Sequence, residues 1–160
     1  MELMNEILNR ENLTSAYENV VRNKGSCGVD GIRTDALKKW LNYHWPRMKD
    51  ELINGTYHPK AVLGVSIPKR SGGERLLGIP TTGDRMIQQA INQVLNPLFD
   101  PEFSPFSYGF RPGKNAGQAI GQTLVYINQG YNSIVDIDLQ RFFDEVNHDY
   151  LMNLIKRKVK

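Results

Sequence analysis

Residues 134–144 decide the expected fold, and they read Ile134-Val135-Asp136-Ile137-Asp138-Leu139-Gln140-Arg141-Phe142-Phe143-Asp144. The β-branched residues at their start predict a β-strand over 132–138 that delivers a carboxylate to its end. An aromatic pair follows at a fixed offset. A hard anion on a rigid element suits Mg²⁺, and a bulky wall beside it suits the sugar of a nucleotide. The stretch therefore predicts one element of a metal-dependent nucleotidyl-transfer site.

The two aspartates of this stretch are expected on one face of the strand. Side chains alternate along a strand, so Asp136 and Asp138 lie about 7 Å apart on one face, whereas Val135 and Ile137 take the other. Two carboxylates repel if they are buried together, so this face is either wet or occupied by a cation. For an Asp-x-Asp pair alone, an exposed strand face is the simpler interpretation. The aromatic pair and the position near the strand's end favour the metal site.

The rest of the chain combines helical patterns with one hairpin pattern. Apolar residues at helical spacing predict helices over residues 13–21, from about 35 to 54, over 86–98, over 116–127, and from about 148. Residues 61–67 and 75–79 are expected to pair as a β-hairpin around the turn at 69–74. Helices, a hairpin and a separate strand, without a regular βαβ repeat, predict an α+β fold.

Capping and proline patterns set the expected helix ends. Asn12 is a candidate N-cap for the first helix, and Thr34 for the second. Pro46 is expected to kink the second helix or split it in two. Asn54-Gly55 is expected to end it, because glycine adopts the left-handed conformation of a helix C-terminus.

The composition bounds the class of protein. A length of 160 residues corresponds to about one domain. The net charge of +3 is compatible with a polyanionic partner without establishing one. A lone cysteine, Cys27, excludes an intrachain disulfide and a cysteine-based zinc site, and it agrees with a reducing cytoplasm. No apolar run approaches the ~18–20 residues of a membrane span, and the N-terminus is not a signal peptide, so no membrane partner is expected.

Three sets of basic residues are candidate phosphate contacts. Lys69 and Arg75 flank the hairpin turn and could close over a triphosphate, although surface hairpins often carry such residues for solubility alone. The loop from Tyr108 to Arg111 could stack on bases and bind phosphate, or it could be a structural anchor with Arg111 in an ion pair. Arg85 could contact nucleic-acid phosphate, or pair with a neighbouring carboxylate at Asp84 or Glu74. The residues alone leave these alternatives open.

Read together, several short strings give a resemblance to a known family. They are Gly-Val-Asp-Gly at 28–31, Gly-Thr-Tyr-x-Pro at 55–59, Ile-Pro-Lys at 67–69, Arg75, Leu-Gly-Ile-Pro-Thr at 77–81, Asp-Arg-Met-Ile-Gln-Gln-Ala-Ile at 84–91, Ser-Tyr-Gly-Phe-Arg-Pro-Gly at 107–113, Asp-Ile-Asp-Leu-Gln-Arg-Phe-Phe-Asp at 136–144 and Val-Asn-His-Asp at 146–149. In this order and spacing, the chain resembles the N-terminal part of reverse transcriptases encoded by bacterial group II introns, the maturase type. The likeness covers nearly the whole chain from about residue 12.

The resemblance implies a right-hand polymerase, of which this chain would be the fingers and a partial palm. Residues 1–33 would form an N-terminal extension, residues 34–130 the fingers, and residues 131–160 the truncated start of the palm. The implied partners are intron RNA, an RNA template with a DNA primer, and dNTPs, in the bacterial cytoplasm. The implied roles include maturase activity in intron RNA splicing and mobility.

The resemblance also implies roles for individual residues. Asp138 matches the first metal-binding aspartate and so the catalytic position, and the backbone carbonyl of Leu139 would complete the metal shell. Phe143 matches the aromatic steric gate that would clash with a 2′-OH and so select dNTPs. The remaining implied contacts are Arg141 and Phe142 through backbone amides to the triphosphate, Lys69 and Arg75 as fingertip cations, and Arg85 and Arg111 as guides of the RNA template.

The implied mechanism is two-metal phosphoryl transfer, with two Mg²⁺ ions in the complete enzyme. The Tyr-x-Asp-Asp string that carries the remaining ligands is missing from the 160 residues. We therefore expect a truncated fragment that does not polymerise, and does not retain the two ions, alone. Alternatives are a non-catalytic intron-RNA-binding module and a related bacterial reverse transcriptase outside introns. Self-association through an exposed sheet edge and apolar surface is also possible.

Overall fold

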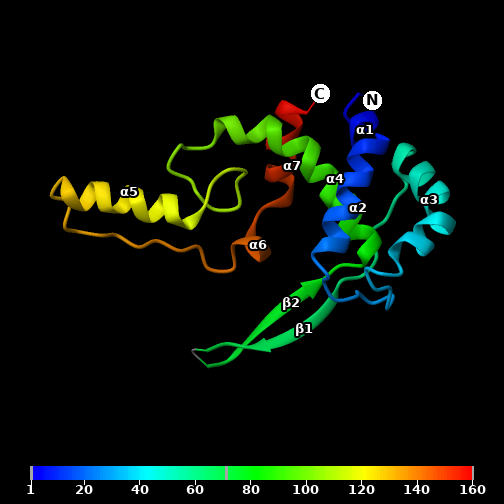
Figure 1. Ribbon diagram of the computed structural model, residues 1–160, viewed down its shortest axis with the longest axis horizontal. Helices are drawn as coiled ribbons and strands as arrows, with labels where there is room; N and C mark the ends of the chain where they lie inside the picture. Colours follow the sequence, from blue (N-terminus) through cyan, green and yellow to red (C-terminus); the bar gives the residue numbers. More distant parts are fainter. Residues whose placement is uncertain (1, 71, 160) are drawn as a thin grey trace. The chain divides into compact units, whose positions relative to one another are not determined.

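The computed structural model describes residues 2–70 and 72–159 (Figure 1). Its elements, in chain order, are α1 (Glu2–Ile7), α2 (Arg10–Arg22), α3 (Leu37–Ile53), β1 (Leu63–Pro68), β2 (Glu74–Ile79), α4 (Thr82–Phe99), the 3₁₀ turn η1 (Asp100–Glu102), α5 (Ala116–Asn128), α6 (Phe142–Glu145) and α7 (His148–Lys158). Helices predominate, and the described strands form one antiparallel pair. This mixture confirms the α+β expectation and the hairpin.

The chain divides into two compact units, residues 1–96 and 97–160. The first holds α1 to α3, the hairpin and most of α4, and the second holds the rest. The region boundaries expected at 33/34 and 130/131 concern the parts of a polymerase, and they stay predictions.

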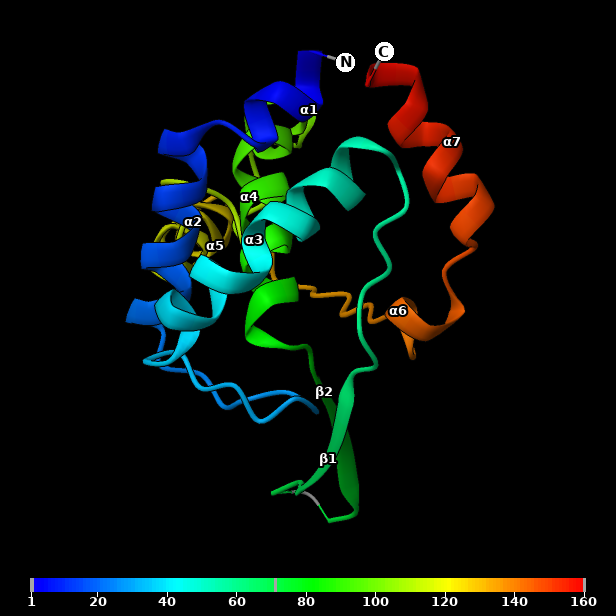
Figure 2. The same ribbon diagram turned by 90° about the vertical axis from the view of Figure 1, so that its right-hand side faces the viewer.

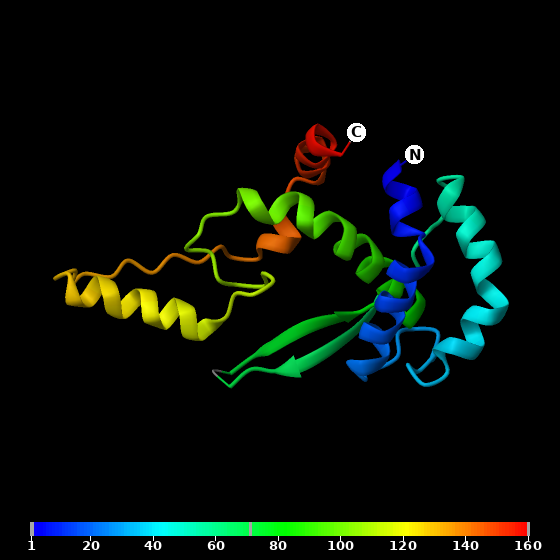
Figure 3. The same ribbon diagram turned by 45° about the horizontal axis from the view of Figure 1, so that its top comes forward.

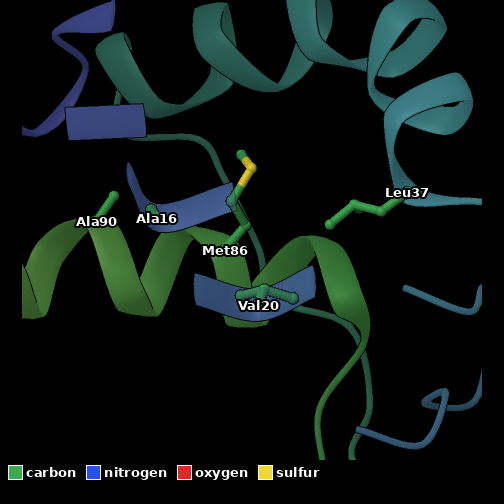
Figure 4. Packing of buried hydrophobic residues seen from close by; sticks show 5 residues of the cluster. All are labelled: Ala16, Val20, Leu37, Met86 and Ala90. Atoms are coloured by element: carbon green, nitrogen blue, oxygen red, sulfur yellow. The ribbon is translucent and has the colours of Figure 1, made fainter. Parts of the chain in front are cut away.

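The core of the first unit lies where α2, α3 and α4 meet. Figure 3 shows α2 running between α3 and α4. Figure 4 shows the residues that these helices contribute to the buried cluster, namely Ala16 and Val20 from α2, Leu37 from α3, and Met86 and Ala90 from α4. The two alanines are completely buried. Small side chains at these positions fit between α2 and α4, and the apolar face of α4 contributes Met86 and Ala90 to the core.

A carboxamide network also joins α2 to α4. The amide of Gln93 donates to the side-chain oxygen of Asn12 at 2.6 Å, and its oxygen accepts from Asn19 at 3.1 Å. Asn12 in turn donates to the carbonyls of Ile7 and Ala90. Because these groups are partly buried and paired, they fix the register of the two helices.

The helix ends differ from the expected ones in two places. Asn9, not Asn12, caps α2 by accepting from the backbone N–H of Glu11, because Asn12 is engaged with α4. The helix α3 starts at Leu37, without a side-chain cap from Thr34. It continues through Pro46 as one helix, so of the two outcomes expected there, a kink or a split, the split is wrong. The expected end at Asn54-Gly55 is confirmed.

The hairpin of the first unit is exposed along nearly all of its length. Its register pairs Leu63 with Ile79 at the root and Pro68 with Glu74 near the tip. Only Leu63 and Ile79, at the root, are half-buried. Figure 2 shows the hairpin extending beyond the helices of its unit. Gly72 and Gly73 take positive φ angles of 87° and 79°, which the tight turn requires and other residues rarely adopt.

The second unit contains the stretch on which the predicted site was built. A capping box formed by Asn115 and Gln118 starts α5. The extended segment that follows α5 runs back beside it (Figure 1), where the rings of Tyr126 and Tyr131 meet edge to face at 6.0 Å. The polypeptide then turns into α6 and α7.

The β-strand expected over residues 132–138 is wrong. These residues are extended but belong to no strand in the part of the chain that the structure describes. Their side chains are exposed, including Ile134, Val135 and Ile137 at about four-fifths or more. The segment does contain the β-branched residues that favour a strand. A strand, however, forms only by hydrogen bonding to a neighbouring strand, and no described strand lies beside this segment.

Candidate functional site

Asp138 stands at the end of the extended segment, where the sequence places it. Its Oδ1 accepts a hydrogen bond of 2.9 Å from the backbone N–H of Leu139. Among described residues nothing donates to Oδ2, and the side chain is exposed. The carboxylate is therefore oriented by its own backbone and retains free lone pairs. Asp136 is exposed as well.

The aromatic pair lies at the start of α6, four and five residues past Asp138. The rings of Phe142 and Phe143 meet edge to face with centroids 5.5 Å apart. Phe143 is 87% exposed, so its face is available to a ligand. Arg141 immediately before it adopts the left-handed conformation (φ 52°, ψ 37°), a strained conformation for a residue with a side chain. The bend ends the extended segment and places both phenylalanines in the first turn of α6.

The side chain of Arg141 is turned toward its own helix. Its guanidinium forms ion pairs with Asp144 at 3.4 Å and Glu145 at 3.7 Å. These groups are about two-thirds exposed, so the pairs are weak and easily exchanged.

Lys69 and Arg75 lie at the tip end of the hairpin, on opposite strands. Arg75 pairs with Ile67 in the register, and Lys69 directly follows β1. Both side chains are exposed, and neither forms an ion pair with a described residue. The neighbouring Glu74 accepts from Ser66 at 2.6 Å instead. The structure thus brings the cationic side chains of Lys69 and Arg75 to the end of a projecting hairpin.

Arg85 is directed at the glycine-rich loop that precedes α3. Its Nη2 donates to the carbonyl of Ser26 at 2.6 Å, and its Nε is buried without a partner among described residues. A Cβ added to Gly25 would lie 2.4 Å from Nη1, so a larger residue there would require the guanidinium to move. Arg85 pairs with neither Asp84 nor Glu74, which were its expected structural partners.

Arg111 is almost buried and has several hydrogen-bond partners. Its Nε and Nη2 donate to the carboxylate of Asp100, and its Nη1 donates to the carbonyls of Ser104 and Ser107. Its side chain is 9% exposed. The hydrogen bond from Arg111 lowers the pKa of Asp100, and the same bond raises the pKa of Arg111. Of the two interpretations of this loop, the contacts favour the structural anchor.

The oxygen donors near Asp138 suit Mg²⁺ in kind. The carboxylate of Asp138 and the backbone carbonyl of Leu139 are hard ligands, with no soft donor between them, and Asp136 is expected to be a neighbour rather than a ligand. Within residues 2–70 and 72–159, however, no group of three or more metal-binding side chains comes together. The described residues therefore fit part of a magnesium shell, and the remaining ligands would have to come from elsewhere.

A cluster around Asp84 was missed by the sequence analysis. Asp84, at the start of α4, accepts hydrogen bonds from Tyr57, Thr81 and the backbone of Lys60. The spacing Thr81-x-x-Asp84 is that of a helix capping box, and this signal could have identified two of its members. The contacts from residues 57 and 60 depend on the tertiary fold.

No described helix combines the length and apolar character needed to cross a lipid bilayer.

Comparison with known proteins identifies the family. The family model "Reverse transcriptase (RNA-dependent DNA polymerase)" matches residues 67–159, from the end of β1 through α7. Protein YkfC of Escherichia coli is 32% identical over 163 residues, covering 98% of this chain and 43% of that protein. Group II intron-encoded protein LtrA of Lactococcus lactis is 33% identical over 146 residues, covering 91% of this chain and 24% of that protein.

A yeast protein extends the likeness beyond bacteria. The putative COX1/OXI3 intron 1 protein of Saccharomyces cerevisiae is 27% identical over 168 residues, covering 99% of this chain and 20% of that protein. The chain thus spans less than half the length of each of these relatives. The family match includes Asp138, Phe143 and Arg75, and it covers more than half of the 160 residues. The chain therefore belongs to the reverse transcriptase (RNA-dependent DNA polymerase) family.

Proposed function

We propose that this chain forms the fingers and the start of the palm of an RNA-directed DNA polymerase encoded by a bacterial group II intron. The observation that carries the proposal is the stretch from Asp138 to Phe143, in which an exposed carboxylate precedes an exposed aromatic ring within the matched family region. The relative LtrA is named a group II intron-encoded protein, and this name supports the proposal that a group II intron encodes this chain as well. Intron RNA, an RNA template with a DNA primer and dNTPs would be the partners, in the bacterial cytoplasm.

Each site residue would have a distinct chemical role. Asp138, with the carbonyl of Leu139, would hold Mg²⁺, which in the complete polymerase activates the primer 3′-OH and stabilises the leaving pyrophosphate. Phe143 would lie against the sugar and exclude a 2′-OH. Lys69 and Arg75 would neutralise the triphosphate, Lys69 as a point charge and Arg75 as a fork. Backbone N–H groups at Arg141 and Phe142 would bind its oxygens.

The two template residues would act mainly through the loops they hold. Arg85 would order the loop at residues 25–31 through Ser26, and the exposed part of its guanidinium would approach template phosphate. Arg111 would hold the loop at 104–111 in shape beside the RNA, since its donors already have partners. In both cases the template would meet an ordered loop, which lowers the entropy lost on binding.

A polymerase assay tests the proposal. The chain is joined to the remaining palm and thumb of a member of the same family, and incorporation of dTTP on a poly(rA) template with an oligo(dT) primer is measured. We expect Mg²⁺-dependent synthesis by the joined protein and none by the 160 residues alone, because they contain no Tyr-x-Asp-Asp string. Absence of synthesis by a folded joined protein would contradict the proposal, and synthesis by the 160 residues alone would contradict the expected dependence on further ligands.

A second candidate function is intron-RNA binding without catalysis, in support of splicing and mobility. The observation that favours it is the set of exposed cations for which residues 2–70 and 72–159 supply no carboxylate partner, Lys69 and Arg75 among them. Phosphate contacts need cations rather than Asp138, so such binding would weaken steeply with salt and survive Asp138→Ala. Loss of RNA binding in Asp138→Ala, measured by filter retention from 50 to 200 mM KCl, would count against this role.

A further inference from the structure

One buried carboxylate bonds to both ends of the hairpin. Asp84 is 3% exposed. Its Oδ1 accepts from the hydroxyl of Tyr57 at 2.5 Å, and its Oδ2 accepts from the hydroxyl of Thr81 at 2.6 Å and from the backbone N–H of Lys60 at 3.2 Å. Tyr57 and Lys60 precede β1, Thr81 follows β2, and Asp84 belongs to α4. We call these four residues the root cluster.

The carboxylate of Asp84 has no cationic partner among described residues. Lys60, the closest candidate, bonds through its backbone, while its ammonium lies 3.8 Å from Asp30 and over the ring of Trp40. A buried charge held by neutral donors alone is costly unless the donors are well placed, and an apolar side chain would fill the position without that cost. Packing of apolar side chains alone therefore does not explain why a carboxylate occupies this position.

The phenol at this site is held in its protonated, donating form. Burial and then the hydrogen bond to Asp84 raise the pKa of Tyr57 well above its ordinary value of 10.0. A raised folded-state pKa gives stability that is present below the ordinary value and lost as pH rises through the raised one. Throughout the neutral range the contact between Tyr57 and Asp84 is therefore complete.

The direction of the hairpin can be set only at its root. Beyond Leu63 and Ile79 both strands are exposed, so no described helix packs along them. A two-stranded hairpin on its own is marginally stable in water. Five residue steps separate the root pair from Pro68 and Glu74, which corresponds to a lever of about 17 Å. A rotation of roughly 10° at the root would shift the tip by about 3 Å, the length of a hydrogen bond.

We propose that Asp84 is the positioning residue that fixes the direction of the hairpin and thereby places Lys69 and Arg75 against the triphosphate. The placement of the tip rests on the proposed function, whereas the fixing of the hairpin does not. Asp84 contacts no substrate in this scheme. It acts through Tyr57 and Thr81, which hold the two chain segments that lead into and out of the sheet.

The first test measures the direction of the hairpin in the 160-residue chain. Spin labels are placed at exposed positions by Arg70→Cys near the tip and Lys49→Cys on α3, with Cys27→Ser removing the native thiol. Pulsed dipolar spectroscopy then gives the distribution of distances between the two labels. Both positions belong to the first unit, so the distribution reports the hairpin alone.

Matched variants separate positioning from general destabilisation. Thr81→Val keeps the shape of the side chain and removes its hydroxyl, whereas Thr81→Ser keeps the hydroxyl; Tyr57→Phe is matched by Tyr43→Phe, which is 83% exposed. We expect Asp84→Asn, Thr81→Val and Tyr57→Phe to broaden the distance distribution at least twofold, and Thr81→Ser and Tyr43→Phe to leave it unchanged. An unchanged distribution in folded Thr81→Val and Tyr57→Phe would overturn the proposal, even if Asp84→Asn failed to fold.

The second test links the root cluster to nucleotide binding. In the joined polymerase, Thr81→Val is expected to raise the KM for dNTP about tenfold and to change kcat less than about threefold. The reason is that a misplaced hairpin tip weakens binding of the triphosphate and leaves the chemical step largely unaffected. Thr81→Ser should restore the KM. If the distance distribution broadens while the KM stays unchanged, the role of Asp84 in fixing the hairpin is kept. That result would refute the placement of Lys69 and Arg75 on the triphosphate.

Discussion

The guanidinium of Arg111 meets the carboxylate of Asp100 at two points, with Nε 2.8 Å from Oδ1 and Nη2 3.2 Å from Oδ2. The remaining nitrogen, Nη1, donates to the carbonyls of Ser104 and Ser107. One side chain therefore closes the loop between η1 and α5. Nη2 also donates to the backbone carbonyl of Asp100 at 2.9 Å. A lysine could neutralise Asp100, but its single ammonium could not reach all of these acceptors at once.

Replacement of Arg111 by lysine should loosen this loop. We expect chymotrypsin to cleave the Arg111→Lys variant about tenfold faster at Phe106, Tyr108 or Phe110, because local opening exposes the backbone. Cleavage is followed by mass spectrometry under native conditions. Arg141→Lys is the control, because Arg141 is about two-thirds exposed and pairs only within its own helix. Equal cleavage rates in the two variants would mean that Arg111 does not hold the loop.

The ion pair between Asp100 and Arg111 also predicts that the free energy of unfolding depends on pH in the acidic range. The hydrogen bond from Arg111 lowers the pKa of Asp100 below its ordinary value of 3.8. A lowered folded-state pKa contributes stability that is present above the ordinary value and lost as pH falls through the lowered one. Urea unfolding of the wild type and of Asp100→Asn should therefore differ most above about pH 4, with the difference shrinking toward pH 2. A difference that stays constant from pH 7 to 2 would contradict this assignment.

Gly28 should tolerate no larger residue. A Cβ at this position would lie 2.7 Å from the backbone nitrogen of Thr81 and 2.9 Å from the carbonyl carbon of Pro80, and backbone atoms cannot rotate away. We expect Gly28→Ala to lower the free energy of unfolding by about 1–3 kcal/mol, measured in urea. The control is Gly121→Ala in α5, where nothing lies within 4 Å of the new methyl group. That change should raise stability by roughly 0.5–1 kcal/mol.

Phe143 should set the choice between deoxyribonucleotides and ribonucleotides. Its exposed ring lies within the matched family region, where the proposed role is to exclude the 2′-OH. In the joined polymerase, Phe143→Ala is expected to raise kcat/KM for a ribonucleotide relative to its deoxyribonucleotide by roughly 10–100-fold, corresponding to about 1.4–2.7 kcal/mol. Phe142→Ala is the matched control, and equal selectivity in the two variants would contradict the assignment.

The sequence predicted the local elements of the fold well. The hairpin, the helices that became α4 and α5, and the end of α3 at Asn54-Gly55 all depend on periodicity, turn glycines and caps, which are local signals. Asn12 was mistaken for a cap because its true partners, Gln93 and Ala90, lie far away in the sequence. The strand over 132–138 failed for a similar reason, because a strand requires a neighbour.

The candidate site was predictable only in part. Asp138 and Phe143 belong to one continuous stretch of sequence, and both lie within the region that matches the family. The partners of Arg85 and Arg111 were not predictable, because backbone carbonyls at Ser26 and Ser104 have no sequence signature. The root cluster was invisible for the same reason, since Tyr57 reaches Asp84 only after the chain folds.

The account depends most directly on the carboxylate of Asp138, and one comparison tests it. In the joined polymerase, kcat for dTTP incorporation is measured for Asp138→Ala beside Asp136→Ala, with folding of each variant checked by circular dichroism. We predict that Asp138→Ala lowers kcat by about 10³-fold or more, equivalent to about 4 kcal/mol, whereas Asp136→Ala stays within about threefold of the wild type. A folded Asp138→Ala variant that retains wild-type kcat would contradict the account.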